Sequence, residues 1–333
     1  MALILQDVSI VAVASLNGEG CAKGCAEAEE CAFAVVSTLG DEVSPLLYVN
    51  ESGGAHNGWT ALSLATWTLG DPTDVFGVKS FIMAISGGEA LPLARSQDKG
   101  VSVTYLAGHA DMATHAPYAG DMLSPDKIVI VGADGYVWLS TDYGETWETE
   151  DSGGATIEDL TKVMICRQND AVIYAIGANN ALIKSQNGGY TWFALTGPSA
   201  GDALTALEIT NENDLLIGND DGELWESSDG GVTWTQQAEL PDLPAAASLN
   251  AISCCSCGPV DKAGVCYAII EDTGLTTAHV VYRNAGYGSA QWEVEQGFGD
   301  LTMAPEDIVC CENNRALVVG GDGDDEGFTG LIS

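Results

Sequence analysis

Short apolar segments that end in glycine recur along the chain, and each leads through an alternating, strand-like segment into a turn. The three clearest pairs of segments are residues 128–132 with 136–139, 172–177 with 181–184, and 215–218 with 223–226. Alternation with a period of two, bounded by turn residues, is typical of β-strands. The pattern predicts an all-β fold of many short strands. No helical period is long enough to indicate a second domain.

A turn motif of the form Ser-x-Asp/Asn-x-Gly-x-Thr-Trp follows each of these strands. Its defining residues are Ser140, Asp142, Gly144 and Trp147 in the first copy, Ser185, Asn187, Gly189 and Trp192 in the second, and Ser227, Asp229, Gly231 and Trp234 in the third. Weaker copies begin near residues 50, 96 and 284, and residues 330–333 match the start of another.

The spacing of the motif predicts the architecture. The copies begin near residues 50, 96, 140, 185, 227, 284 and 333, so the steps between them run from 42 to 57 residues. A repeat of about 40–50 residues is typical of one four-stranded blade of a β-propeller. We therefore expect a single seven-bladed β-propeller domain over residues 1–333, with antiparallel blades. The last blade lacks its fourth strand, and residues 2–6 are predicted to supply it and so close the ring.

The motif resembles the Asp-box, or BNR repeat, of sialidases, sortilin-type receptors, two-propeller xyloglucanases and photosystem assembly factors. The resemblance implies a β-propeller whose boxes lie on the face opposite the usual active site. From the residues themselves, we expect the Asp or Asn of each copy to accept hydrogen bonds from turn N–H groups. The glycine is expected to adopt a positive φ, and the tryptophan to pack between blades. These residues are therefore predicted to be structural.

Charge excludes several classes of partner. The 333 residues include 11 Lys and Arg against 48 Asp and Glu, a formal net charge of −37, while 46% are hydrophobic. Nucleic-acid binding needs clustered cations, so no nucleic-acid partner is expected. Residues 1–20 lack the positive start of a signal peptide, and no apolar run approaches the roughly 18 residues of a membrane span. We therefore expect no membrane insertion.

Ten cysteines are many for this fold, and most of them cluster. Cys21 with Cys31 and Cys257 with Cys266 bracket two expected loops and are candidate disulfide pairs, although sequence alone leaves the connectivity open. A zinc site built from Cys254, Cys255, Cys257 and Cys266 is the alternative, but the spacing lacks two Cys-x-x-Cys knuckles. Cys166, Cys310 and Cys311 are expected to be buried free thiols.

The histidines offer little for metal chemistry. His109, Asp111 and His115 are close in sequence and could ligate a metal, but a polar loop explains them equally well. We therefore expect no metal and no cofactor.

The catalysts of related enzymes are not evident. Sialidases of this fold clamp a substrate carboxylate with three arginines, and this chain has only Arg95, Arg167, Arg283 and Arg315. The xyloglucanases need two carboxylates across a cleft between two propellers, and only one propeller is expected here. The assembly factors use a basic patch, which this acidic chain lacks. We therefore expect no catalytic and no cofactor-binding residues, and no enzyme.

The remaining hypothesis is a non-catalytic structural or binding β-propeller. We expect it to be a component of a larger extracellular or virion assembly, such as a tailed-virus particle, with other protein subunits as partners. The alternative is a glycan-binding protein or a glycoside hydrolase of the Asp-box class, for which the partner is a glycan.

Overall fold

The computed structural model contains almost only β-strands. It describes residues 3–6, 10–15, 33–37, 46–50, 59–64, 72–87, 90–151, 153–237, 247–254, 265–272, 278–284, 292–294, 304–311, 315–321 and 326–332. Within these ranges the helices are three short 3-10 turns, η1 (Ala110–Ala113), η2 (Ala133–Gly135) and η3 (Ala178–Asn180). None of these described helices has the length and apolar character that crossing a membrane would require.

The described strands form seven four-stranded antiparallel sheets, which we number one to seven from the N-terminus. Sheet one consists of β2 (Ile10–Ser15), β3 (Phe33–Ser37), β4 (Leu46–Asn50) and β5 (Trp59–Ser63), and sheet two of β6 (Asp74–Val78), β7 (Phe81–Ile85), β8 (Leu93–Ser96) and β9 (Thr104–Leu106). Sheet three consists of β10 (Pro117–Ser124), β11 (Lys127–Gly132), β12 (Tyr136–Ser140) and β13 (Glu148–Asp151), and sheet four of β14 (Leu160–Ile165), β15 (Ile173–Gly177), β16 (Leu182–Ser185) and β17 (Phe193–Ala194). Sheet five consists of β18 (Leu204–Ile209), β19 (Leu215–Asn219), β20 (Leu224–Ser227) and β21 (Thr235–Gln236), and sheet six of β22 (Ala247–Cys254), β23 (Val265–Asp272), β24 (Ala278–Asn284) and β25 (Glu293–Val294). Sheet seven consists of β26 (Ala304–Cys311), β27 (Arg315–Gly321), β28 (Glu326–Ile332) and β1 (Leu3–Gln6).

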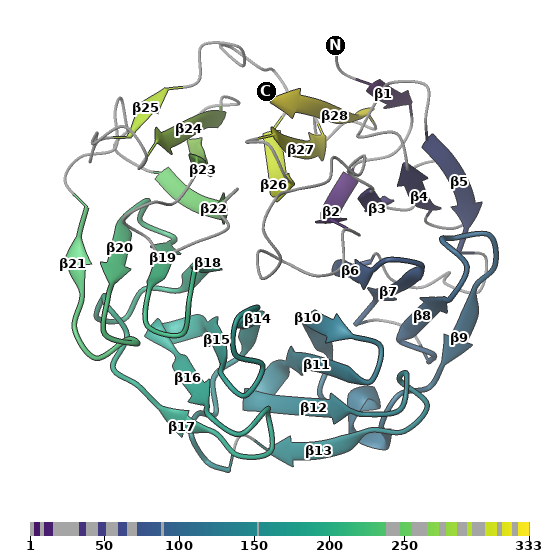
Figure 1. Ribbon diagram of the computed structural model, residues 1–333, viewed down its shortest axis with the longest axis horizontal. Coiled ribbons are helices and arrows are strands. Elements are labelled where there is room, and N and C mark those ends of the chain that lie inside the picture. The colour runs from purple at the N-terminus through teal and green to yellow at the C-terminus, as the bar shows by residue number, and fades with distance from the viewer. Residues whose placement is uncertain are drawn as a thin grey trace.

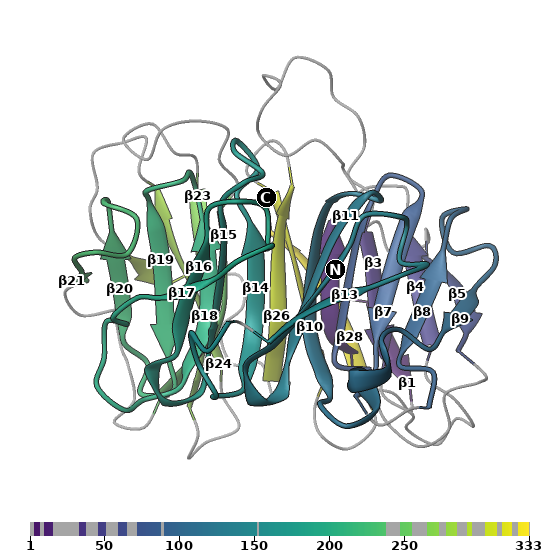
Figure 2. The same cartoon turned by 90° about the horizontal axis from the view of Figure 1, so that it is seen from below.

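The sheets stand around a common axis (Figure 1). The first strand of each sheet lies nearest the axis, and these inner strands contact one another in turn: β2, β6, β10, β14, β18, β22, β26 and again β2. Seen from the side, the strands run across the thickness of the ring (Figure 2). The result is a β-propeller, as the repeats predict.

The two ends of the described chain share one sheet. Strand β1 pairs antiparallel with β28, with Leu3 opposite Thr329 and Gln6 opposite Glu326. The predicted strand over residues 2–6 therefore overlaps β1, whereas Ala2 lies outside the described residues, as does Ser333 of the expected seventh turn motif. This pairing covers the edge of β28 that would otherwise be open.

Apolar side chains of neighbouring sheets meet face to face and form the core. Between sheets three and four, Val129 and Leu139 share one buried cluster with Ile173, Ile183 and Trp192. Strand β11 is buried on both faces from Ile128 to Gly132, which explains why its sequence is a continuous apolar run and does not alternate. Burying each large aliphatic side chain contributes about 1.5–3 kcal/mol, so these inter-sheet layers hold the ring together.

Candidate functional site

The turn motif builds a compact hydrogen-bonded turn between the third and fourth strands of a sheet. In sheet three, Ser140 Oγ accepts the Gly144 N–H at 2.9 Å and donates to Asp142 Oδ1 at 3.0 Å. The Asp142 carboxylate accepts the Thr146 N–H at 2.8 Å and the Thr146 hydroxyl at 2.5 Å. One carboxylate therefore orders the whole turn between β12 and β13.

Equivalent bonds from the backbone N–H groups to the serine and to the Asp or Asn recur in sheets two, four and five. Asn187 and Asp229 accept the N–H of the threonine four residues later, at 2.9 and 2.8 Å. In the weaker copy, Asp98 accepts the Ser102 N–H at 2.9 Å, and Ser96 Oγ accepts the Gly100 N–H at 2.8 Å. Serine therefore replaces threonine there without loss of these bonds. Most residues of the copies that begin near 50 and 284 lie outside the described part of the chain.

The glycine and tryptophan of the motif complete the turn. Gly144, Gly189 and Gly231 have φ values of +76°, +97° and +86°, which L-residues with a side chain rarely adopt. The indoles of Trp147 and Trp192 are buried and donate to the carbonyls of Gly144 and Gly189, both at 3.0 Å. Trp234 differs, because it is half-buried and donates to the Thr196 carbonyl at 3.1 Å.

The turn carboxylates are ionised at neutral pH. Hydrogen bonds from Thr146 lower the pKa of Asp142, and those from Ser102 lower the pKa of Asp98. Bonds from Thr233 lower the pKa of Asp229 to about 2. Each of these carboxylates is committed to its own turn, so none is free to act as a general acid at neutral pH.

Four of these turns also expose an apolar side chain. Val101, Tyr143, Tyr190 and Val232 are 77%, 50%, 48% and 70% exposed, on the turns of sheets two to five in order. We call this row of four residues the turn rim. Because the turns beneath it are fixed by hydrogen bonds, the rim presents apolar groups on a preorganised frame.

Three carboxyl groups that accept hydrogen bonds between inner strands have raised pKa values, a feature that the sequence analysis missed. Burial raises the pKa of Asp74 to about 7 and that of Glu208 to about 8, and it also raises the pKa of Asp307. Perturbed carboxyl groups of this kind are candidates for acid–base catalysis. Here, however, each accepts a backbone N–H of the next sheet. The sequence feature that could have indicated these buried carboxyl groups is an acid within an otherwise apolar strand, such as Leu207-Glu208-Ile209.

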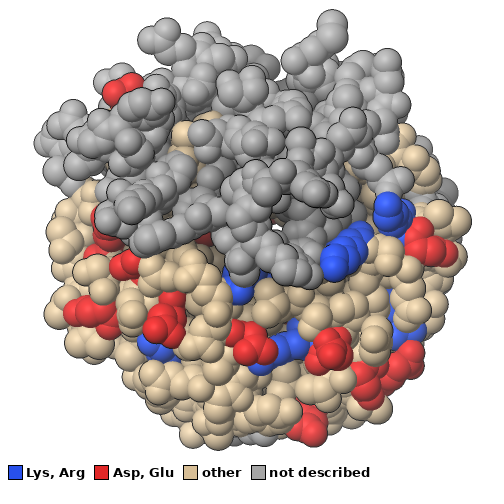
Figure 3. Space-filling model, viewed as in Figure 1, with Lys and Arg blue, Asp and Glu red and all other residues tan. Residues whose placement is uncertain are grey.

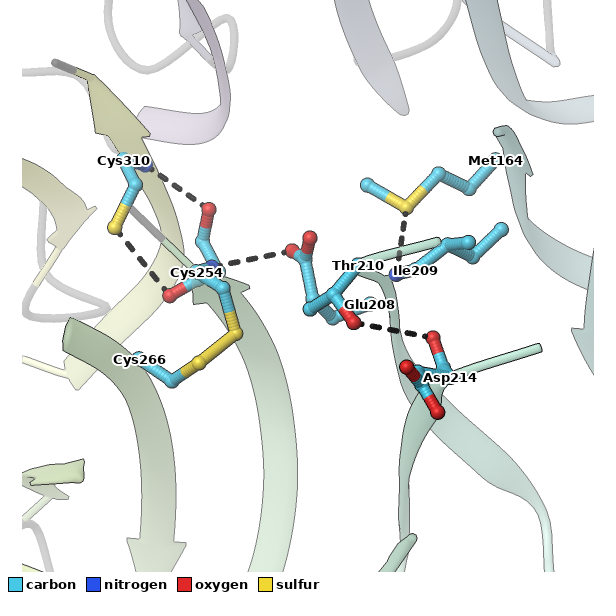
Figure 4. The surroundings of a disulfide bond; sticks show 9 residues. Met164, Glu208, Ile209, Thr210, Asp214, Cys254, Cys266 and Cys310 are labelled. Atoms are coloured by element: carbon cyan, nitrogen blue, oxygen red, sulfur yellow. Dashed lines mark hydrogen bonds between the residues drawn. A yellow bond between two sulfur atoms is a disulfide. The ribbon is translucent and has the colours of Figure 1, made fainter. Parts of the chain in front are cut away.

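The cysteines pair differently from the expectation. A disulfide joins Cys254 to Cys266, which lie directly opposite each other on β22 and β23 (Figure 4). The predicted Cys257–Cys266 pair is therefore wrong, because Cys266 already has a partner. Cys21, Cys31 and Cys257 lie outside the described residues.

The two remaining cysteines whose side chains are described differ from each other. Cys166 is a buried free thiol, as expected. Cys310 is disulfide-bonded, which corrects the expectation of a free thiol, and its partner is a cysteine whose side chain the structure does not describe. A zinc site that uses Cys254 and Cys266 as thiolates is incompatible with their disulfide.

The histidines have separate partners. His109 Nδ1 accepts the Asp111 N–H at 3.2 Å and lies 2.7 Å from Thr149 Oγ1. His115 Nδ1 lies 2.9 Å from Asp134 Oδ2, and its ring stacks on Tyr136 with the centroids 3.7 Å apart. Throughout the described ranges, no three His, Cys, Asp or Glu side chains are placed to hold a metal ion.

Two of the four arginines can be placed by their contacts. Arg95 is buried beneath the turn of sheet three, where it donates to the Tyr143 carbonyl and pairs with Glu145 at 2.7 Å. Arg167 lies after β14 and pairs with Asp121 of β10, also at 2.7 Å. The two guanidinium groups therefore hold different carboxylates. On the face shown in Figure 3, described basic and acidic residues are interspersed.

Comparisons with known proteins identify a fold. No protein-family model and no curated protein matches the chain. Among solved structures, the fold resembles YCF48 bound to D1 peptide, with a TM-score of 0.68, 10% identity and coverage of 100% of this chain and 97% of that one. YCF48 from Cyanidioschyzon merolae has a TM-score of 0.68 and 12% identity, and the match covers 99% of this chain and 97% of that one. An ancestral GH74 enzyme has a TM-score of 0.60 and 15% identity, and the match covers 79% of this chain and 38% of that one. At such low identity, these neighbours establish a β-propeller and no activity.

Proposed function

We propose that the protein is a non-catalytic β-propeller that binds other protein subunits within a larger extracellular or virion assembly, such as a tailed-virus particle. The turn rim is the observation that carries the proposal. Val101 and Val232 are among the most exposed large apolar residues described, and Tyr143 and Tyr190 add aromatic surface. Exposed apolar and aromatic side chains on a rigid frame, on a strongly acidic protein, favour a protein-binding surface.

The proposal includes a specific form of the fold. In it, the chain is a closed seven-bladed propeller with Asp-box turns, and the N-terminal strand completes the last blade. The seven sheets and the pairing of β1 with β28 support this form. So do the equivalent hydrogen bonds of Asp98, Asp142, Asn187 and Asp229 in four turns.

A structural neighbour adds support for a protein partner. One of the YCF48 structures is bound to D1 peptide, so a propeller of similar fold can bind a peptide. We infer the same class of partner here, without inferring the same peptide or the same binding face.

The alternative is a glycan-binding protein or a glycoside hydrolase. The raised pKa values of Asp74 and Glu208 favour it, because a glycosidase needs a carboxylic acid that stays protonated near neutral pH. Against it, each group already accepts a backbone N–H of the neighbouring sheet. A structural role for these carboxyl groups, as acceptors between sheets, is therefore simpler than a catalytic role in glycoside hydrolysis.

Assembly of rim variants tests the proposal. Val101→Lys, Tyr190→Lys and Val232→Lys should each reduce incorporation into the native assembly, with melting temperatures close to that of the wild type. Ile157→Lys is the matched control, because Ile157 is 80% exposed but lies beyond the opposite end of β13 from the turn of sheet three. Normal incorporation of all three rim variants would exclude the rim as the docking surface. Hydrolysis of a glycoside by the purified protein would favour the alternative.

A further inference from the structure

The inner strands are joined to one another by a one-way series of hydrogen bonds. Each inner strand has one edge without a strand partner, so its N–H groups need other acceptors. Among the described residues, a side chain of one sheet accepts an N–H of the next sheet in six of the steps around the ring. The acceptor and donor residues are Asp74 and Gly120 (2.9 Å), Asp121 and Ile165 (2.7 Å), Met164 and Ile209 (3.3 Å), Glu208 and Cys254 (3.3 Å), Ser253 and Cys310 (3.0 Å), and Asp307 and Val13 (3.0 Å).

We call these six contacts the inner-ring joints. Five of them link residues that lie 44 to 57 positions apart in the sequence. The sixth, between Asp307 and Val13, links sheet seven to sheet one across 294 positions. Figure 4 includes the bond from the Cys254 N–H to Glu208, the bond from the Ile209 N–H to Met164, and the bond that the Cys310 N–H donates. The joints therefore act between sheets, where the ring would open.

Three joints differ from the others in their electrostatics. Asp74, Glu208 and Asp307 are ionisable acceptors, and the described residues place no cation within ion-pair distance of them. Asp121 is the contrast, because Arg167 neutralises it at 2.7 Å. Met164 and Ser253 carry no charge at all. Of these six joints, three therefore have an ionisable acceptor without an ion pair, one has an acid paired with an arginine, and two have uncharged acceptors.

The charges around these three carboxyls compensate them only in part. Lys162 of β14 attracts both Asp74 and Asp307, whose own charges repel each other. Glu306, next to Asp307, is itself repelled by Glu271 of β23. Arg167 attracts Glu208, while Asp121 repels it. One lysine thus faces a cluster of acids, and ionisation of the whole cluster leaves net negative charge near the axis.

We propose that the Asp74, Glu208 and Asp307 joints form a proton-controlled clasp, which holds neighbouring sheets together while the carboxyls are protonated and loosens the ring when they ionise. A protonated carboxyl still has a carbonyl oxygen that accepts the N–H of the next sheet. It does so without a desolvated charge, which a buried carboxylate would impose. In Asp74 and Asp307, the protonated oxygen then gives up the N–H of the following residue, Val75 or Ile308. The clasp does not depend on the identity of the partner.

The sign of the effect follows from proton linkage. A carboxyl whose pKa is higher in the folded than in the unfolded protein contributes stability that is fully present below the unfolded pKa of about 4. That contribution is lost as the pH rises through the folded pKa, which is about 7 for Asp74 and about 8 for Glu208. The clasp should therefore be tight near pH 5 and loose near pH 9.

Amide hydrogen exchange of the wild-type protein tests the clasp directly. After correction for the intrinsic exchange rate, protection of the Val13, Gly120 and Cys254 amides should fall about tenfold or more from pH 5 to pH 9, since one pKa unit is a tenfold effect. The Ile165 and Cys310 amides, whose acceptors are the arginine-paired Asp121 and the uncharged Ser253, are internal controls and should lose much less. Equal loss at all five amides, or no loss at the first three, would overturn the proposal.

Neutral variants give a second readout. Asp74→Asn, Glu208→Gln and Asp307→Asn together keep an oxygen acceptor at each joint but cannot ionise, so the melting temperatures at pH 5 and pH 9 should converge. Asp142→Asn is the control, because the pKa of Asp142 is lowered and its turn lies away from the inner strands, so this variant should retain the wild-type difference between the two melting temperatures. A combined variant that keeps the full wild-type pH dependence would contradict the clasp. If it fails to fold, the exchange comparison on wild type still decides.

Discussion

A single Asp or Asn side chain organises each complete turn, and Asp142 is the clearest case. It accepts both the N–H and the hydroxyl of Thr146, and it also accepts from Ser140. The equivalent residue of sheet four is Asn187, whose side-chain oxygen accepts the Thr191 N–H in the same way. The turn therefore requires the oxygen acceptor, and the negative charge is secondary.

That comparison leads to a prediction for Asp142. Asp142→Ala should lower the free energy of unfolding by about 1–3 kcal/mol, because it leaves turn donors without an acceptor. Asp142→Asn should retain most of the stability, as Asn187 does in its own turn. Urea unfolding of the three proteins at pH 7 checks this. An alanine variant as stable as the asparagine variant would show that the turn does not need the side chain.

Acid should weaken the turns in a pH window separate from that of the clasp. The pKa of Asp229 is lowered to about 2 by its bonds from Thr233, so its contribution is present above the unfolded value of about 4 and is lost as the pH falls towards 2. Asp229→Asn should therefore be less stable than wild type at pH 4 and closer to it at pH 2. A stability gap of the same size at both pH values would refute this reading.

At the scale of strands and sheets, the repeats predict most of the fold. The strands that precede each turn were evident because their turns carry a local signature, and they appear as β12 (Tyr136–Ser140), β16 (Leu182–Ser185) and β20 (Leu224–Ser227). The acid of a joint such as Glu208 stands out within an apolar strand, but the partners of the inner-ring joints could not be predicted. They depend on which residue of one sheet faces an open N–H of the next, and no local pattern encodes that register.

The disulfide illustrates the same limit. Loop bracketing suggested Cys257 as the partner of Cys266, but the register of β22 and β23 places Cys254 directly opposite Cys266. Cross-strand pairing therefore decided the partner. Closing a loop of this length contributes about 3 kcal/mol in the chain-entropy model.

Thiol titration tests the cysteine assignments. Under denaturing, non-reducing conditions, fewer than ten thiols should react, because Cys254, Cys266 and Cys310 are oxidised. Cys166 should react only after unfolding, since it is buried and free. Ten reactive thiols would contradict the disulfides, and prior reduction of the protein provides the control that sets the full count.

For the whole molecule, the pairing of β1 with β28 should matter far beyond the four residues of β1. Deleting residues 1–7 exposes the edge of β28 and removes one strand from sheet seven. In an array of mutually packed sheets, that loss should lower the melting temperature of the entire ring. Calorimetry of the deletion variant checks this, and an unchanged melting temperature would show that β1 does not close the ring in solution.

Electron cryo-microscopy of the native assembly tests the central claim most directly, namely that this propeller is a non-catalytic subunit bound to other proteins. We expect a seven-bladed ring whose turn-bearing face, with Val101, Tyr143, Tyr190 and Val232, contacts a neighbouring subunit. A free monomer in the native preparation, or a ring that contacts its neighbours only through other surfaces, would contradict the account.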